Sequence, residues 1–166
     1  MIRIPEALVT EILLDLQRPH PFAHERVGFA FGGSGTTADG SRLVLIKRYL
    51  PVTDDNYLNI DGPPVGAAIN ETAIRTARQE ALTSGDGIFH IHQHAWLGDP
   101  GFSSVDLEGY RKMIPSFVPM APRSPHGAII FSLDDAGALV RWPGCASATR
   151  TPVTVVGFPM RFWGTL

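Results

Sequence analysis

Three histidines alternate with other residues in the segment His90–His94, whose sequence is His-Ile-His-Gln-His. The apolar run Gly87–Phe89 precedes them, and a stretch with helical spacing of apolar residues begins at Ser103 and carries Asp106. Side chains two positions apart on a strand point to the same face, so these histidines can line one wall of a site. Two imidazoles, one carboxylate and an open fourth position form a catalytic zinc site. The segment therefore predicts a Zn²⁺ centre between a strand end and the first turn of the next helix.

A resemblance to a known family rests on these residues and on an acid far upstream. The order His-x-His, a loop, then Ser-x-x-Asp resembles the JAMM motif of the MPN/JAB family of zinc metalloproteases. Glu25 stands in a Glu-x-x-Gly stretch that is similar to the family's first strand. The resemblance runs from about Pro21 to about Pro143 and points to the small stand-alone JAB domains of bacteria. It implies an α/β (α+β) fold, a cytidine-deaminase-like mixed β-sheet flanked by helices.

The resemblance also implies a ligand set. His94 lies twelve residues before Asp106, slightly more than the family's usual spacing, and His92 lies fourteen before it. We therefore expect His92, His94 and Asp106 to bind the metal, with His90 deeper on the strand as a core or supporting histidine. The alternative register uses His90 and His92 as the histidine pair.

The expected chemistry is hydrolysis of an amide bond by a metal-activated water, without a covalent intermediate. Zinc lowers the pKa of a bound water and polarises a carbonyl oxygen. Glu25 is expected to take the proton of the water and pass it to the leaving amine. Ser103 is expected to stabilise the oxyanion, with Ser104 as the nearby alternative. Ser103 and Asp106 also resemble a capping box with Asp in place of Glu or Gln, and one residue can serve both purposes.

JAMM domains cut isopeptide bonds that follow the C-termini of ubiquitin-like proteins. The resemblance thus implies a deubiquitinase-like zinc isopeptidase that acts beside activating and conjugating enzymes, in bacterial conjugation or antiphage systems. One alternative is a peptidase that processes a ubiquitin-like or sulfur-carrier precursor. Another is a catalytically silent MPN scaffold or binding module, although a scaffold needs no open metal site. A structural zinc site is disfavoured because the chain has a single cysteine.

Apolar periodicity predicts the elements that position these residues. The expected helices are Pro5–Gln17, Asn70–Ser84 and a third that begins at Ser103 and is broken at Pro115. The expected strands are Arg26–Gly33, Arg42–Leu50, Gly87–His94, His126–Phe131, Ala138–Trp142 and Thr151–Gly157. Asn70 is expected to cap the second helix and Gly85 to end it. Pro51–Gly66 is expected to be a polar loop that faces the substrate.

The bulk composition is that of one domain spanning residues 1–166. Apolar residues make up 44% and charged residues 18%, and the net charge of −2 does not indicate a nucleic-acid or anionic-membrane partner. No run of about eighteen apolar residues is present, so no membrane span is expected. Acids interrupt the first apolar segment, which argues against a signal peptide. We expect a cytoplasmic protein.

Two further side chains invite a catalytic interpretation that the sequence does not support. Cys145 lies among loop residues with no histidine near it, so a loop thiol is expected. His126 follows Ser124 by two positions, but no carboxylate or oxyanion loop accompanies them, so a structural histidine is expected.

Overall fold

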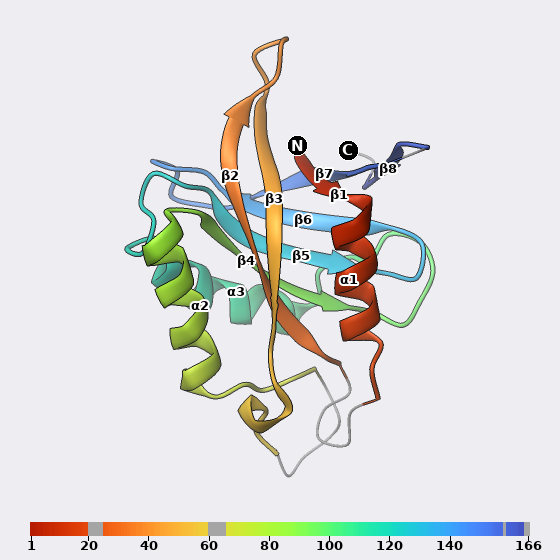
Figure 1. The fold of residues 1–166 in the computed structure, drawn as a ribbon, viewed down its shortest axis with the longest axis vertical. Coiled ribbons are helices and arrows are strands. Elements are labelled where there is room, and N and C mark those ends of the chain that lie inside the picture. The colour runs from red at the N-terminus through yellow and green to blue at the C-terminus, as the bar shows by residue number, and fades with distance from the viewer. Residues whose placement is uncertain (20–24, 60–65, 158, 165–166) are drawn as a thin grey trace.

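The structure is a computed structural model that describes residues 1–19, 25–59, 66–157 and 159–164. Within these ranges, eight strands form one sheet and three α-helices lie against it (Figure 1). The strand order is β1-β3-β2-β4-β5-β6-β7-β8, and β1 also pairs with β7. The first seven strands therefore close into a barrel. The mixed α+β class expected from the sequence is confirmed, and the closure of the sheet was not expected.

The element bounds follow the predicted ones closely. The strands are β1 (Ile2–Pro5), β2 (Val27–Thr36), β3 (Arg42–Pro51), β4 (Gly87–Gln93), β5 (His126–Phe131), β6 (Ala136–Arg141), β7 (Thr149–Val156) and β8 (Arg161–Trp163). The helices are α1 (Glu6–Leu16), α2 (Glu71–Ser84) and α3 (Ser104–Phe117), with a short 3₁₀ helix, η1 (Asp54–Asn56). Only β1 and β8 were missed, because strands of four and three residues are too short to display alternation.

The side chains of β4 alternate between two cores, and this alternation decides where the histidines lie. Phe89 and Ile91 face a core that α1 covers, together with residues of β1, β3, β5 and β7. Ile88 faces the opposite side, where it packs with the small residues of α2. His90 and His92 share the parity of Ile88, so they point towards α2 and α3. The site is therefore built between the sheet and these two helices.

The connection from β4 to β5 brings Asp106 to the histidines. β4 and β5 are parallel neighbours, so the chain must cross over between them, and α3 lies within that crossover. The crossover carries the chain from the carboxyl end of β4 into the first turn of α3. That topology places the N-terminus of α3 beside the segment that carries His92 and His94.

The predicted break at Pro115 is wrong, because α3 continues through it to Phe117. A proline inside a helix removes one hydrogen bond and crowds the preceding turn. Here the last turn is fixed by burial: Ile114 is 4% exposed and Phe117 is fully buried. The ring of Phe117 meets that of Phe29 edge to face, with 6.2 Å between centroids. This packing offsets the cost of the proline.

The two ends of α2 agree with the sequence prediction. The side chain of Asn70 accepts a hydrogen bond from the backbone N–H of Ala73 at 3.1 Å, which is an N-cap. Gly85 follows the helix with φ of 73°, the left-handed conformation that glycine adopts without strain. Local chemistry therefore marks both ends of the helix, as the sequence predicts.

The segment 51–66, expected to be a polar loop, is described except for residues 60–65. It contains η1, and Tyr57 forms an isolated bridge with Ile69. The Tyr57 hydroxyl accepts from Val27 N at 2.8 Å and donates to Val27 O at 3.1 Å, which ties the loop to the start of β2. The expectation that it faces the substrate stays a prediction.

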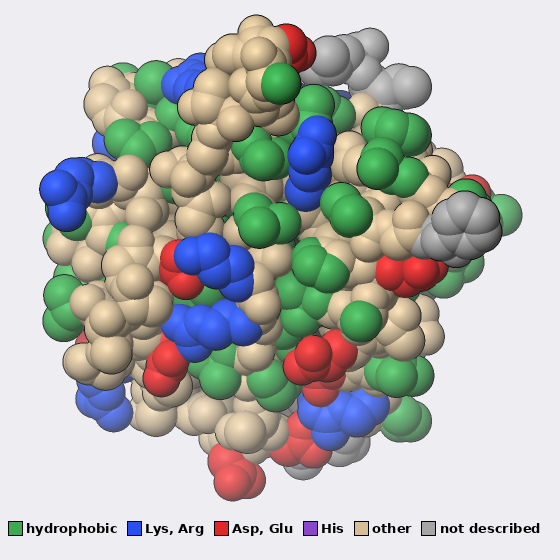
Figure 2. Space-filling model, turned by 45° about the horizontal axis from the view of Figure 1, so that its top comes forward, with side chains coloured by type: hydrophobic (Ala, Val, Ile, Leu, Met, Phe, Trp, Pro, Cys, Tyr) green, Lys and Arg blue, Asp and Glu red, His purple; other side chains and the backbone are tan. Residues whose placement is uncertain are grey.

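Surface charges are interspersed on the face drawn in Figure 2, where basic and acidic side chains lie beside each other and among hydrophobic ones. Two ion pairs illustrate this mixing: Lys47 with Asp86 at 2.7 Å, and Arg48 with Glu80 at 2.6 Å. Among the described residues, no helix has both the length and the apolar character that crossing a membrane requires.

Candidate metal centre

His92 and His94 meet at the end of β4. His92 pairs with Val27 of β2 on one side and with Ile130 of β5 on the other. His94 lies just beyond the strand and stays in line because its N–H donates to Phe131 O at 2.8 Å. Both imidazoles are buried, at 2% and 4% exposure, and their Nε2 atoms are 3.0 Å apart. Two potential ligand nitrogens thus converge on one point.

Asp106 approaches this point from the first turn of α3. The predicted capping box is confirmed: the N–H and the hydroxyl of Ser103 both donate to Asp106 Oδ2, at 2.8 and 2.6 Å. Ser103 Oγ in turn accepts from the Asp106 N–H at 3.1 Å. Asp106 Oδ1 lies 3.3 Å from His92 Nε2, and Oδ2 lies 3.7 Å from His94 Nε2. The cap fixes the carboxylate so that Oδ1 faces His92 and Oδ2, which accepts the cap hydrogen bonds, lies nearer His94.

The spacing of these atoms fits a tetrahedral zinc ion. With zinc–nitrogen and zinc–oxygen bonds of about 2.0–2.1 Å, neighbouring tetrahedral ligand atoms are about 3.3–3.4 Å apart. The two Nε2 atoms are 3.0 Å apart and Asp106 Oδ1 is 3.3 Å from His92 Nε2, both close to that value, whereas the 3.7 Å to His94 Nε2 is measured from the other carboxylate oxygen, Oδ2. His92, His94 and Asp106 can therefore hold one ion with small adjustments of side-chain torsions.

Glu25 lies beside this cluster rather than inside it. It precedes β2, whose first residue pairs with His92, and its Oε2 is 3.9 Å from His92 Nε2. Ligand atoms of Glu25, His92 and His94 all lie within 4.8 Å of one another, so Glu25 could also serve as a ligand. Asp106 is closer to His92 and is held by its cap, so both carboxylates are candidates for the third ligand position. The Glu25 side chain is 27% exposed and adjoins solvent.

The outer nitrogens of both rings have partners that direct Nε2 towards the cluster. His94 Nδ1 is 2.9 Å from Pro100 O, and because a carbonyl only accepts, Nδ1 carries the proton and Nε2 a lone pair. His92 Nδ1 is 3.2 Å from the hydroxyl of Tyr110, which can donate or accept. A cation between the Nε2 atoms thus requires the proton of His92 to be on Nδ1, where Tyr110 accepts it. Such outer partners orient metal-bound histidines.

Burial favours the neutral form of His92, which is the form that binds metal. Desolvation lowers the pKa of His92, and Asp106 opposes that shift only in part. Burial, together with the charges on Asp106 and Glu25, raises the pKa of Tyr110, so its hydroxyl stays protonated. His92 therefore has a lone pair available for a metal, and Tyr110 keeps its hydroxyl proton beside it.

His90 stands apart from the cluster. Its ring packs edge-on against Phe29, with 5.7 Å between centroids, and its centroid is 5.8 Å from that of His92. Burial lowers its pKa to about 3, and within the described part of the chain its Nδ1 has no hydrogen-bond partner. Of the two registers considered from the sequence, the structure brings together the atoms of the pair His92 and His94. Metal binding by this pair is a proposal developed below.

Three features of the site were not singled out from the sequence. Tyr110 is one, although its position four residues after Asp106 places both on one side of α3. The carbonyl of Pro100 gave no sequence signal, because any residue has one. Trp96 stacks on the ring of His94 with 4.1 Å between centroids, and it is 49% exposed.

The loop between His94 and Ser103 is fastened to neighbouring strands. Gly98 N–H donates to Asp134 Oδ1 at 2.7 Å, and Leu133 N–H donates to Trp96 O at 2.9 Å. Asp99 forms an ion pair with Arg150 of β7. These contacts hold the backbone that presents Pro100 O to His94, so the loop is a fixed part of the site.

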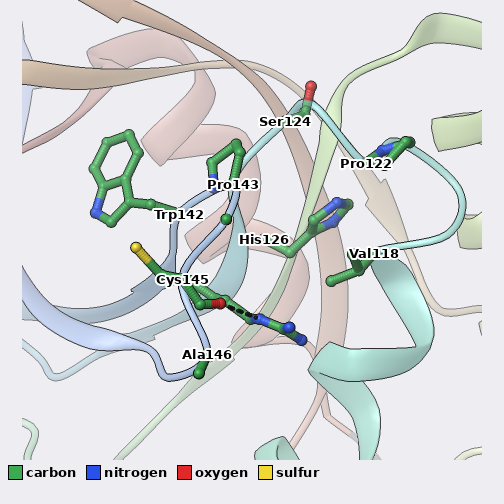
Figure 3. Close-up of a pocket in the computed structure, with 10 residues that line it drawn as sticks. Val118, Pro122, Ser124, His126, Trp142, Pro143, Cys145 and Ala146 are labelled. Atoms are coloured by element: carbon green, nitrogen blue, oxygen red, sulfur yellow. Dashed lines mark hydrogen bonds between the residues drawn. The ribbon is translucent and has the colours of Figure 1, made fainter.

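Ser124 and His126, which lie in the hollow drawn in Figure 3, form no catalytic pair. His126 Nδ1 accepts from the Ile88 N–H at 3.1 Å, and its Nε2 donates to Ala121 O at 2.9 Å. The Ser124 hydroxyl donates instead to Gly85 O at 2.6 Å. The expected structural role of His126 is confirmed.

No family model matches this sequence, and no match was found among curated proteins. Among solved structures, the N-terminal domain of STIL from Trichoplax adhaerens is similar over 84% of this chain, with 13% identical residues and a TM-score of 0.40. The similarity spans 40% of that chain. A likeness of this size carries no argument about family or function, so the following proposals rest on the site and on the sequence motif.

Proposed function

We propose that this chain is a zinc-dependent peptidase of the JAMM type. One observation carries the proposal: carboxylate oxygens of Glu25, from far upstream in the chain, and of Asp106, from α3, lie 3.9 and 3.3 Å from His92 Nε2, which is itself 3.0 Å from His94 Nε2. The resemblance to the JAMM motif named these four residues in these roles. An MPN-type assignment of the fold is part of the same proposal.

Different residues of the chain have different roles in the proposed hydrolysis. Zinc, when bound, supplies a water of lowered pKa and a positive charge for the substrate carbonyl. Glu25 takes the proton from the attacking water and gives it to the leaving amine, for which its partly exposed position beside His92 is suited. Asp106 and the two histidines hold their places through the Ser103 cap, Pro100 O and Tyr110.

Ser103 is the proposed donor to the oxyanion, and the cap sets a condition for that role. Its hydroxyl proton is directed at Asp106 Oδ2, at 2.6 Å. To serve the oxyanion, the hydroxyl must turn away from Asp106, while the Ser103 N–H keeps the carboxylate in place at 2.8 Å. Ser104, in the first turn of α3, is the alternative donor.

The proposed substrate is the amide bond after the C-terminus of a ubiquitin-like protein, in a cytoplasmic conjugation system with its activating and conjugating enzymes. This substrate class follows from the resemblance. The surroundings of the site are compatible with a polypeptide, because Trp96, Leu97 and Val105 expose 49%, 70% and 57% of their surface near it. Where such side chains form a contiguous patch, they mark a site of protein interaction.

The proposal is tested by a substitution that should abolish turnover and leave the metal content unchanged. Glu25→Gln should keep zinc and lose hydrolysis of both an isopeptide-linked conjugate and a linear ubiquitin-like fusion. Glu108→Gln is the matched control, since Glu108 is exposed on α3 and pairs with Lys112 away from the histidines. Retained hydrolysis in Glu25→Gln would remove that residue from the mechanism.

Which substrate is cleaved distinguishes between the alternative functions. Cleavage of the conjugate indicates an isopeptidase, and cleavage of the linear fusion alone indicates a precursor-processing peptidase. If the wild-type protein holds zinc but cleaves neither substrate, the scaffold interpretation is the better one.

A further inference from the structure

A groove runs along α3 on the side that faces β6 and the loop after it. Its volume is about 370 Å³, and Leu107, Ile114 and Leu139 provide its apolar walls. The helix residues that line it extend from Leu107 to Pro115. At a rise of about 1.5 Å per residue this stretch is about 12 Å long. That length corresponds to about four residues of an extended peptide at about 3.3 Å each.

The groove is cationic as well as apolar. Arg111 and Arg141 both line it, and none of the described lining residues is acidic. Within the described residues, neither arginine forms an ion pair. Arg141 is anchored because its Nε donates to Cys145 O at 3.0 Å, which leaves its terminal nitrogens for a ligand. Guanidinium groups are suited to bind carboxylates through two parallel hydrogen bonds.

A second hollow continues the groove. Its volume is about 250 Å³, and Arg141 and Ala146 line both hollows. Figure 3 shows this second hollow between the end of α3 at Val118 and the turn from Trp142 to Ala146. Two adjoining hollows in a row suit an elongated ligand better than a compact one.

The groove begins next to the candidate metal centre, although His92, His94 and Asp106 are not among the residues that line it. Leu107, at its start, is the residue after Asp106. Tyr110 lines the groove while its hydroxyl contacts His92 at 3.2 Å. A chain lying along α3 would therefore have one end close to Asp106.

We propose that this groove is a substrate subsite that binds an extended peptide segment carrying apolar side chains and a carboxylate. The apolar walls take the aliphatic side chains, and Arg111 and Arg141 bind the carboxylate. The proposal deepens the proposed function, because it rests on the substrate being a polypeptide. It adds a preference for an acidic residue within about four positions of the scissile bond.

Direct binding tests the subsite without any hydrolysis. The probe is a fluorescein-labelled tetrapeptide, Leu-Glu-Val-Leu, followed by anisotropy on the metal-free protein. Matched probes carry Gln or Lys in place of Glu. We expect saturable binding of the Glu peptide, and affinity reduced by about ten-fold or more for the Gln peptide, as for loss of a charged hydrogen-bond partner.

Reversing the charge of a groove arginine tests whether the peptide binds in the groove. Arg111→Glu should lower the affinity of the protein for the Glu peptide by about ten-fold or more. Arg75→Glu makes the same change of charge at an exposed position on α2 and should leave the affinity within about two-fold. Absence of saturable binding, equal binding of the three peptides, or equal weakening by both variants would overturn the subsite. Zinc binding and hydrolysis can remain intact in that event, and peptide binding can remain if hydrolysis is absent, so the two proposals fail separately.

Discussion

Replacing Tyr110 by phenylalanine removes a single oxygen atom, the one that lies 3.2 Å from His92 Nδ1. The ring is 4% exposed, so water does not readily take the place of the hydroxyl. With a metal on Nε2, the proton of His92 must be on Nδ1, and in Tyr110→Phe that buried N–H has no acceptor. Loss of an outer partner of a ligand histidine typically costs about 10–100-fold in metal affinity. This corresponds to about 1.4–2.7 kcal/mol.

The assay is a zinc titration in competition with a chromophoric chelator, for wild type and Tyr110→Phe. Tyr49→Phe is the control, because that tyrosine is partly buried and donates to Asp15 at 2.7 Å, within a different group of residues. We expect the control to lose stability and keep its zinc affinity. Equal zinc affinity for wild type and Tyr110→Phe would refute the reasoning that Tyr110 accepts the proton of a metal-bound His92.

Further predictions concern the ligand, the fold and pH. Asp106→Asn should abolish zinc binding, measured by the same titration, and unchanged affinity would remove Asp106 from the ligand set. Asn70→Ala should lower the free energy of unfolding by about 1 kcal/mol through loss of the α2 cap, with zinc affinity unchanged. Burial lowers the pKa of His126, so its imidazole should remain mostly neutral at pH 6.5, which NMR titration of the ring shifts can check. Because the unfolded chain then binds more protons than the folded one, His126 should make the protein less stable as pH falls below about 6.5, and denaturant unfolding should show that sign.

The sequence was sufficient for the parts of the site that depend on local spacing. His-x-His on a strand puts two imidazoles on one face, and Ser-x-x-Asp at a helix start forms a cap whatever the rest of the fold does. The two patterns together anticipated that His92, His94 and Asp106 would meet. The distance from Glu25 to His92 depends on the pairing of β2 with β4, and only the resemblance suggested it.

The parts that were missed depend on contacts between distant segments. β1 pairs in parallel with β7, so that Ile2 lies opposite Val153. No local sequence pattern near either residue predicts that the sheet closes there. The continuation of α3 through Pro115 depends on Phe117 reaching Phe29 of β2. Tertiary burial overrode the local preference of proline there, which a periodicity argument cannot detect.

The zinc content of the purified protein, alongside that of His94→Ala and His90→Leu variants, tests the central claim most directly. His94 Nε2 belongs to the cluster, whereas the ring of His90 packs against Phe29 outside it. We predict about one zinc ion per chain in the wild type and in His90→Leu, and none in His94→Ala. Absence of zinc from the wild type after reconstitution with equimolar metal, or zinc retained in His94→Ala, would contradict the proposed centre.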